Sequence, residues 1–92
     1  MSVAKQIEHR LATAFSPELL EVIDESEKHI GHAGYREGGE SHFRVRIRAG
    51  IFGKMSRIER HRAVHQALGR ELTERIHALQ LTIEAQDSRP AA

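Results

Sequence analysis

The chain contains no cysteine. Disulfide bonds are therefore impossible, and a small secreted scaffold of the kind that disulfides usually hold together is not expected. Thiolate catalysis is excluded for the same reason. So is any zinc or iron–sulfur site that the chain would build from its own cysteines.

Long hydrophobic runs are also missing. No apolar stretch approaches the roughly 18 residues that a membrane-spanning helix needs, and the first residues lack the hydrophobic centre of a signal peptide. We therefore expect a cytoplasmic protein that makes no use of a membrane.

An excess of charge of one sign is also missing, because positive and negative side chains nearly balance and the formal net charge is only +1. A preference for nucleic acid would therefore have to come from basic residues placed locally.

The 92 residues suffice for one domain with a modest core and no deep enclosed active site. Hydrophobic residues make up 39% and charged residues 29%, which is typical of a globular chain. Histidine is plentiful instead, at seven residues.

The N-terminal third predicts a helix and a short strand. Ser2 can cap a helix that runs to about Phe15, and Ser16-Pro17 ends it because a residue before proline avoids helical geometry. Leu19–Ile23 alternates as a strand. The apolar stripe of the helix repeats every four residues and consists of Val3, Ile7, Leu11 and Phe15.

Asp24–Ser41 reads as a long, mobile loop, because it holds four glycines and several charges together with His29 and His32. His42–Ala49 is the clearest strand. Its odd-numbered residues from Phe43 are apolar, and its even-numbered residues are His42 and three arginines. We expect His42, like His9, to face solvent.

The C-terminal half predicts two helices and a last strand. Ser56 and Glu59 fit a capping box that opens a helix to about Leu68, and Gly69 separates it from a short helix, Arg70 to about Arg75. Leu79, Leu81 and Ile83 then alternate as a strand. The residues that we expect near one face of the helical pair are Ile58, His61, His65, Leu68 and Leu72.

This element order predicts the fold class. A helical pair that joins two strands allows those strands to be parallel with a right-handed crossover. The expected fold is therefore α+β, an αββααβ two-layer domain in which helices cover one face of a three-stranded mixed sheet.

Four segments, by their order and spacing, resemble the BolA family from about Ser2 to Ile83. They are Leu20-Glu21-Val22-Ile23-Asp24-Glu25-Ser26, Glu40-Ser41-His42-Phe43-Arg44-Val45, Arg60-His61-Arg62 and Ile76-His77-Ala78-Leu79. The family fold is αββααβ, similar to the type II KH arrangement, and agrees with the order above. The resemblance implies a BolA-like domain over residues 2–86, followed by a flexible tail over 87–92.

The resemblance also implies a function. BolA proteins are non-enzymatic partners of monothiol glutaredoxins, with which they hold a bridging [2Fe–2S] cluster in iron–sulfur trafficking or iron regulation. The family's ligand histidine before the last strand matches His77, and its loop ligand matches His29, with His32 as the alternative. The isolated chain, which has no thiolate, is expected to carry no cofactor and to be a monomer.

Other interpretations of the same residues stay open. On sequence alone, a packed histidine at the edge of the sheet is the favoured interpretation of His77, and the family resemblance reverses that preference. His61 and His65 are spaced to bind zinc from one helix face, but no third ligand is evident. The runner-up function is a DNA-binding transcriptional regulator that uses a helix-turn-helix-like surface with Arg57, Arg60 and Arg62. An enzyme has little support, since the loop carboxylates form no evident buried pair.

Overall fold

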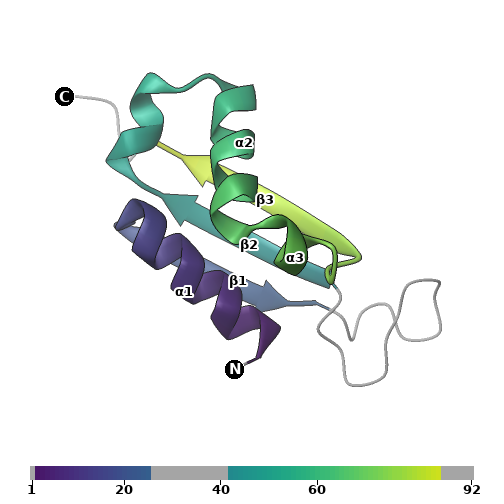
Figure 1. Ribbon diagram of the computed structural model, residues 1–92. Coiled ribbons are helices and arrows are strands. Elements are labelled where there is room, and N and C mark those ends of the chain that lie inside the picture. The colour runs from purple at the N-terminus through teal and green to yellow at the C-terminus, as the bar shows by residue number, and fades with distance from the viewer. Residues whose placement is uncertain (1, 26–41, 86–92) are drawn as a thin grey trace.

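The computed structural model describes residues 2–25 and 42–85 as one two-layer unit (Figure 1). Its elements follow the predicted order, with one 3-10 helix, η2, in addition. They are α1 (Val3–Phe15), β1 (Leu19–Asp24), β2 (His42–Arg48), η2 (Gly50–Lys54), α2 (Arg57–Leu68), α3 (Arg70–Thr73) and β3 (Ala78–Glu84). The predicted α+β fold class is confirmed. The predicted tail, 87–92, lies outside the described residues.

The three strands form one mixed sheet in the order β1-β2-β3. β1 pairs antiparallel with β2, with Leu19 opposite Arg48 and Asp24 opposite Phe43. β2 pairs parallel with β3, with His42 opposite Ala78 and Arg48 opposite Glu84. β1 is one residue longer than predicted, so Asp24 belongs to the strand. The rest of the predicted loop, from residue 26 to residue 41, lies outside the described residues.

The apolar stripe of α1 faces the core as predicted. The hydroxyl of Ser2 accepts a hydrogen bond from the backbone N–H of Lys5 at 3.1 Å, which caps the first turn. Ser16 adopts a left-handed conformation, with φ of 44°, and ends the helix before Pro17. Val3, Ile7 and Leu11 are buried.

The α2 helix begins at the predicted capping box. Ser56 accepts from the N–H of Glu59, and the Glu59 carboxylate accepts from the N–H of Ser56. The predicted apolar face is wrong in part. Leu68 is buried, as is Leu72 of α3, but Ile58 is 62% exposed.

The structure also places His61 and His65 on the exposed side of α2 and buries Val64 instead. Apolar residues are sparse in this helix, and its two histidines and isoleucine mimic a stripe that the tertiary packing does not use. Packing against the rest of the core, and not the spacing of these side chains, therefore decides which face of α2 is buried.

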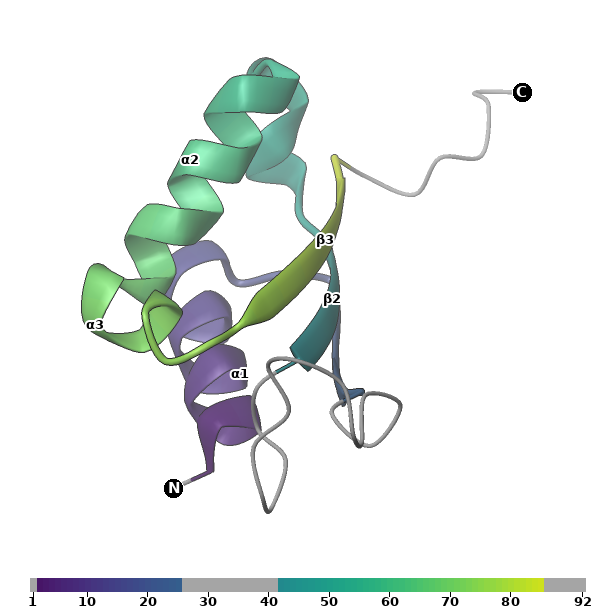
Figure 2. The ribbon, with the colours of Figure 1, turned by 90° about the vertical axis from the view of Figure 1, so that its right-hand side faces the viewer.

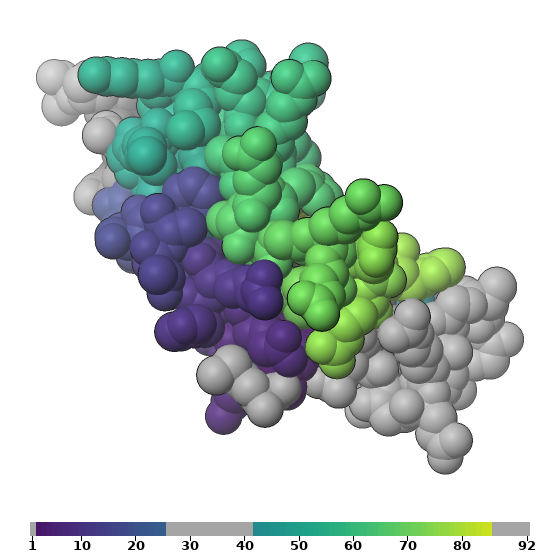
Figure 3. Space-filling model, viewed as in Figure 1, coloured from purple at the N-terminus to yellow at the C-terminus, as the bar shows by residue number. Residues whose placement is uncertain are grey.

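The core lies between the sheet and the helices. Figure 2 shows α1, α2 and α3 on one side of the sheet, and Figure 3 shows that from this side they cover most of it. Phe43, Val45 and Ile47 of β2 are at most 2% exposed, which confirms that the odd-numbered side chains of this strand face inward. The remaining buried apolar residues are Val3, Ile7, Leu11, Ala49, Phe52, Val64, Leu68 and Leu72.

Gly69 sets the direction in which α3 leaves α2. Its φ of 83° and ψ of 147° lie in a region that is nearly restricted to glycine. The guanidinium of Arg10, from α1, donates a hydrogen bond to the carbonyl of Leu68 and lies directly beside this glycine. A Cβ atom on Gly69 would lie 2.8 Å from Nη1 of Arg10. The α2–α3 turn is therefore fixed by backbone conformation and by a contact from a third helix.

We predict that Gly69→Ala lowers the free energy of unfolding by about 1–3 kcal/mol, because it adds backbone strain and displaces Arg10. Urea denaturation measures the change. Gly53→Ala is the matched control, since a Cβ there meets only the Cβ of Ala85, at 3.9 Å. Equal stability of the two variants would contradict this role of Gly69.

Candidate functional site

Three separate parts of the chain meet at one corner of the sheet, where β1 ends and both β2 and β3 begin (Figure 1). The backbone N–H of Glu25 donates to the carbonyl of His42 at 2.8 Å, which extends the β1–β2 pairing to this corner. Since His42 pairs in register with Ala78, the residue before β3, His77, lies there too. The parallel pairing of β2 with β3 thus brings together two histidines that are 35 positions apart.

The rings of His42 and His77 are in contact. Their centroids lie 5.0 Å apart, and their planes are inclined by 53°. His42 is only 5% exposed, whereas His77 is exposed. The expectation that His42 faces solvent is therefore wrong, while His9 is exposed as expected.

The corner also contains a hollow of about 310 Å³, lined by residues of β2 and β3 and by Glu25, which follows β1. His42 and Glu25 line it directly. Its remaining lining residues are Phe43, Ala78, Leu79 and Gln80. His77, the exposed ring of the pair, can present an imidazole nitrogen to a ligand that approaches this corner from outside.

The corner by itself supplies only part of a metal-binding set. Within residues 2–25 and 42–85, no group of three or more histidines or carboxylates is arranged to hold a metal ion. His29 and His32 lie outside the described residues, so neither can be placed. The segment that carries them is nonetheless joined to the described chain at Glu25 and His42, both of which line the corner's hollow. A four-ligand centre would thus need donors from that segment, from a partner, or from both.

The outer face of the sheet pairs its arginines with carboxylates. Arg46 lies 3.2 Å from Glu84 and 3.6 Å from Glu21. Arg48 lies 3.2 Å from Glu84, and Arg44 lies 3.4 Å from Glu25. The hydrogen bond from Arg46, aided by the nearby charges of Arg46 and Arg48, lowers the pKa of Glu84. The basic stripe that the sequence shows along β2 is therefore largely neutralised.

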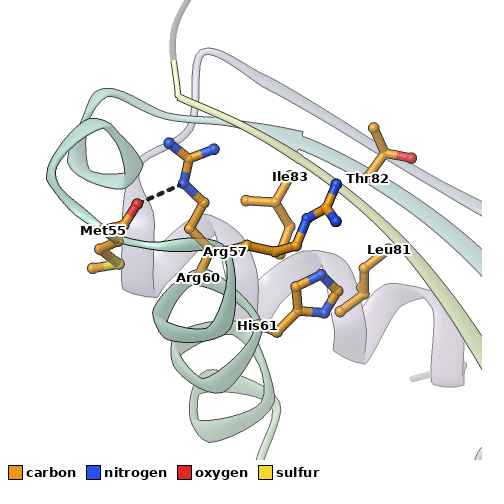
Figure 4. A pocket seen from close by; sticks show the side chains of 7 residues that line it. All are labelled: Met55, Arg57, Arg60, His61, Leu81, Thr82 and Ile83. Atoms are coloured by element: carbon orange, nitrogen blue, oxygen red, sulfur yellow. Dashed lines mark hydrogen bonds between the residues drawn. The ribbon is translucent and has the colours of Figure 1, made fainter.

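The arginines of α2 have different roles. The Nε of half-buried Arg60 donates to the backbone carbonyls of Phe52, at 2.9 Å, and Met55, at 3.2 Å, and so holds η2 against α2. Arg57 and Arg62 are exposed. Arg57, Arg60 and His61 line a groove of about 480 Å³ between α2 and β3 (Figure 4).

Comparison with known proteins identifies the family. The family model described as BolA-like protein matches residues 11–88. The chain belongs to the BolA family. It is similar to the "DNA-binding transcriptional regulator BolA" of Escherichia coli, with 40% identity over 88% of this chain and 73% of the relative. It is also similar to "BolA-like protein 1" of Mus musculus, with 44% identity over 84% of this chain and 53% of that relative.

Solved BolA structures have the same fold. The "BolA domain of SufE1 from Arabidopsis thaliana" superposes with a TM-score of 0.76 and 34% identity, over 91% of this chain and 92% of that one. The chain spans only about half the length of the mouse relative.

Among the described residues of this BolA-like chain, no helix is long and apolar enough to cross a membrane.

His42 is the site residue that sequence reasoning missed. Its even-numbered position placed it on the face of β2 that carries the arginines, and this alternation predicted that its side chain is exposed to solvent. The side chain is instead buried at the start of the strand, where the ring of His77, from a distant segment, lies against it. The available signal was its position as the first residue of a strand directly after the histidine-bearing loop.

We predict that acid protonates Glu84, breaks its ion pairs with Arg46 and Arg48, and so lowers the stability of the protein. Because the pKa of Glu84 is lowered from 4.5 in the folded chain, its stabilisation is present above the unfolded value and is lost as the pH falls through the lower folded value. Glu84→Gln should lower stability at about pH 7 and flatten the loss of stability below about pH 4.5. Urea midpoints across this range measure both effects.

Glu8→Gln is the control for this experiment, since it removes an exposed carboxylate from α1 that lies in no ion pair among the described residues. If the Glu84→Gln and Glu8→Gln proteins lost stability in acid with the same profile, the assigned role of Glu84 would be wrong.

Proposed function

We propose that this BolA-family chain binds a monothiol glutaredoxin and shares a [2Fe–2S] cluster with it through histidine ligands. The chain acts in iron–sulfur trafficking or iron regulation and catalyses no reaction of its own. His77 is the principal ligand, and His29, or His32 in its place, is the second. The observation that carries the proposal is the exposed His77 ring, held against His42 beside an open hollow at a corner of the sheet.

The donor set of the chain suits a shared site. Cluster irons are usually held by thiolates, but histidine replaces cysteine on one iron in some [2Fe–2S] centres. This chain supplies imidazole and no thiolate, so the remaining sulfur ligands must come from the partner. When bound, the cluster would supply its iron–sulfur redox and transfer chemistry to the complex.

The surroundings of His77 prepare it for this role. Strand pairing fixes Ala78 opposite His42, and Ile76 packs against the core on the other side of His77. The contact with His42 further limits the directions that the His77 ring can take. A ligand that is exposed yet restrained can bind an incoming iron with little loss of side-chain entropy.

We predict that His77→Ala abolishes the histidine-ligated spectrum of the co-expressed complex, because it removes the fixed nitrogen ligand. His29→Ala should weaken the spectrum, and His32→Ala should do so if it is the loop ligand. Visible circular dichroism of the purified pair with a monothiol glutaredoxin measures the effect.

His65→Ala is the matched control, since it removes an exposed histidine from α2 that neither lines the corner's hollow nor contacts the His42–His77 pair. Far-ultraviolet circular dichroism checks the fold of each variant. An unchanged cluster spectrum in the His77→Ala complex would refute the ligand assignment even if the two proteins still bound each other.

DNA binding is a second candidate function, favoured by the name of the Escherichia coli relative, a DNA-binding transcriptional regulator. The basic residues available for it are few. Arg60 is engaged with the carbonyls of Phe52 and Met55, and Arg44, Arg46 and Arg48 lie beside carboxylates. Arg57 and Arg62 remain as exposed cations on α2.

We predict only weak, sequence-independent DNA binding by the isolated chain. With about two phosphate contacts, from Arg57 and Arg62, affinity should fall about tenfold between about 50 and 200 mM salt. Arg57→Ala and Arg62→Ala should each weaken binding, whereas Arg60→Ala should mainly lower stability. Fluorescence anisotropy with labelled duplexes measures this, and tight, sequence-selective binding at physiological salt would make DNA the primary ligand.

A further inference from the structure

The outer edge of β3 presents unpaired backbone groups. Within residues 2–25 and 42–85, β3 pairs only with β2, so its other side is an edge of the sheet. The N–H of Ala49 donates to the carbonyl of Glu84 at 3.0 Å, which shows that Glu84 points its backbone groups toward β2. Because successive residues of a strand point these groups to opposite sides, Leu81 and Ile83 direct theirs outward.

This edge borders the groove between α2 and β3. The groove has a volume of about 480 Å³, and its lining includes Leu81, Thr82 and Ile83 on the strand side. On the helix side, Figure 4 shows Arg57 and His61 reaching across it toward Leu81 and Thr82. In Figure 2 β3 lies in front of β2, so its free edge faces the viewer.

Two features define what would fit the groove. Outward N–H and C=O groups on alternate residues of a strand match the backbone of another extended chain. The cations of the opposite wall favour carboxylates, because Arg57 has no carboxylate partner among the described residues and His61 can also donate hydrogen bonds. Met55 adds an apolar surface at the end of the groove.

We propose that the β3 edge and the adjoining groove bind an extended acidic peptide segment of a partner protein. The segment adds as a fourth strand along β3, exchanges backbone hydrogen bonds with Leu81 and Ile83, and directs carboxylates toward Arg57 and His61. This surface lies at the α2 side of β3 and uses none of the proposed cluster ligands. The proposal therefore needs no cluster and stands or falls separately from that function.

The test uses the whole chain without a cluster and a labelled probe peptide of alternating glutamate and valine, of the same length as β3. The peptide repeat places all its glutamates on one face of an added strand. Fluorescence anisotropy measures affinity. Amide hydrogen exchange, followed by NMR, measures protection of individual backbone N–H groups.

In the free chain, the amides of Leu81 and Ile83 should exchange faster than those of Thr82 and Glu84, which bond to β2. Peptide binding should slow exchange at Leu81 and Ile83 by about tenfold or more, as expected for amides newly paired in a ladder. The same peptide with methylated backbone nitrogens carries the same charge but cannot donate along the edge, so it should fail to bind.

Charge reversal identifies the helix wall. Arg57→Glu should weaken peptide binding about tenfold or more, because it places like charges opposite each other. Arg62→Glu is the matched control. It makes the same change on the same helix outside the groove lining, and it should leave the affinity nearly unchanged. Far-ultraviolet circular dichroism confirms that both variants fold.

Three results would overturn the proposal. The first is no binding at about 1 mM peptide, and the second is binding that leaves the Leu81 and Ile83 amides unprotected. The third is another occupant of the same edge. A single-stranded oligonucleotide that binds more tightly and is weakened equally by Arg57→Glu and Arg62→Glu would assign the groove to nucleic acid. Concentration-dependent protection of these amides without peptide would assign it to a second copy of the chain.

Discussion

The parallel pairing of β2 with β3 is the constraint on which the candidate site depends. Parallel neighbours cannot be joined by a tight turn, so the chain must cross over through η2, α2 and α3 before β3 can start. That crossover returns the chain to the end of the sheet where β2 began. The antiparallel β1 ends at the same place. His77, His42 and Glu25 meet at one corner because the strand directions leave no other arrangement.

The crossover also gives the two faces and the edge of the sheet separate roles. Helices cover the inner face and bury Phe43, Val45 and Ile47. The outer face pairs its arginines with Glu21, Glu25 and Glu84, which leaves little free positive charge there. β3 remains at an edge beside α2, with a groove along it. The corner and the β3 edge are thus the parts of the sheet that can bind a ligand, because their exposed groups are not needed for packing the core.

The sequence predicted what depends on local patterns. Alternation in β2 gave the buried face correctly, and the Ser56–Glu59 capping box marked the start of α2. The face of α2 was wrong, since Ile58, His61 and His65 imitate a stripe that long-range packing leaves exposed. The burial of His42 was missed, because strand parity says which way a side chain points but not which residues of other segments lie against it. The family motif selected His77, and only the strand register placed it against His42.

Arg60 shows the same limit for charge. In the sequence it is one of three arginines on a helix that could contact phosphate, yet its position relative to η2 makes it a donor to two backbone carbonyls. A basic residue's role therefore depends on which acceptors the fold brings near it. Counting arginines along α2 or β2 overestimates the charge that is available to a polyanion.

The central claim is that this chain supplies imidazole nitrogen to a cluster whose sulfur ligands belong to its partner. Pulsed electron paramagnetic resonance of the reduced complex tests it most directly, with the histidines of this chain labelled with nitrogen-15 and the glutaredoxin unlabelled. The account predicts a strong nitrogen coupling to the cluster that changes its isotopic signature with the label. A cluster with no such coupling, or one whose coupling is unchanged by labelling this chain, would contradict it.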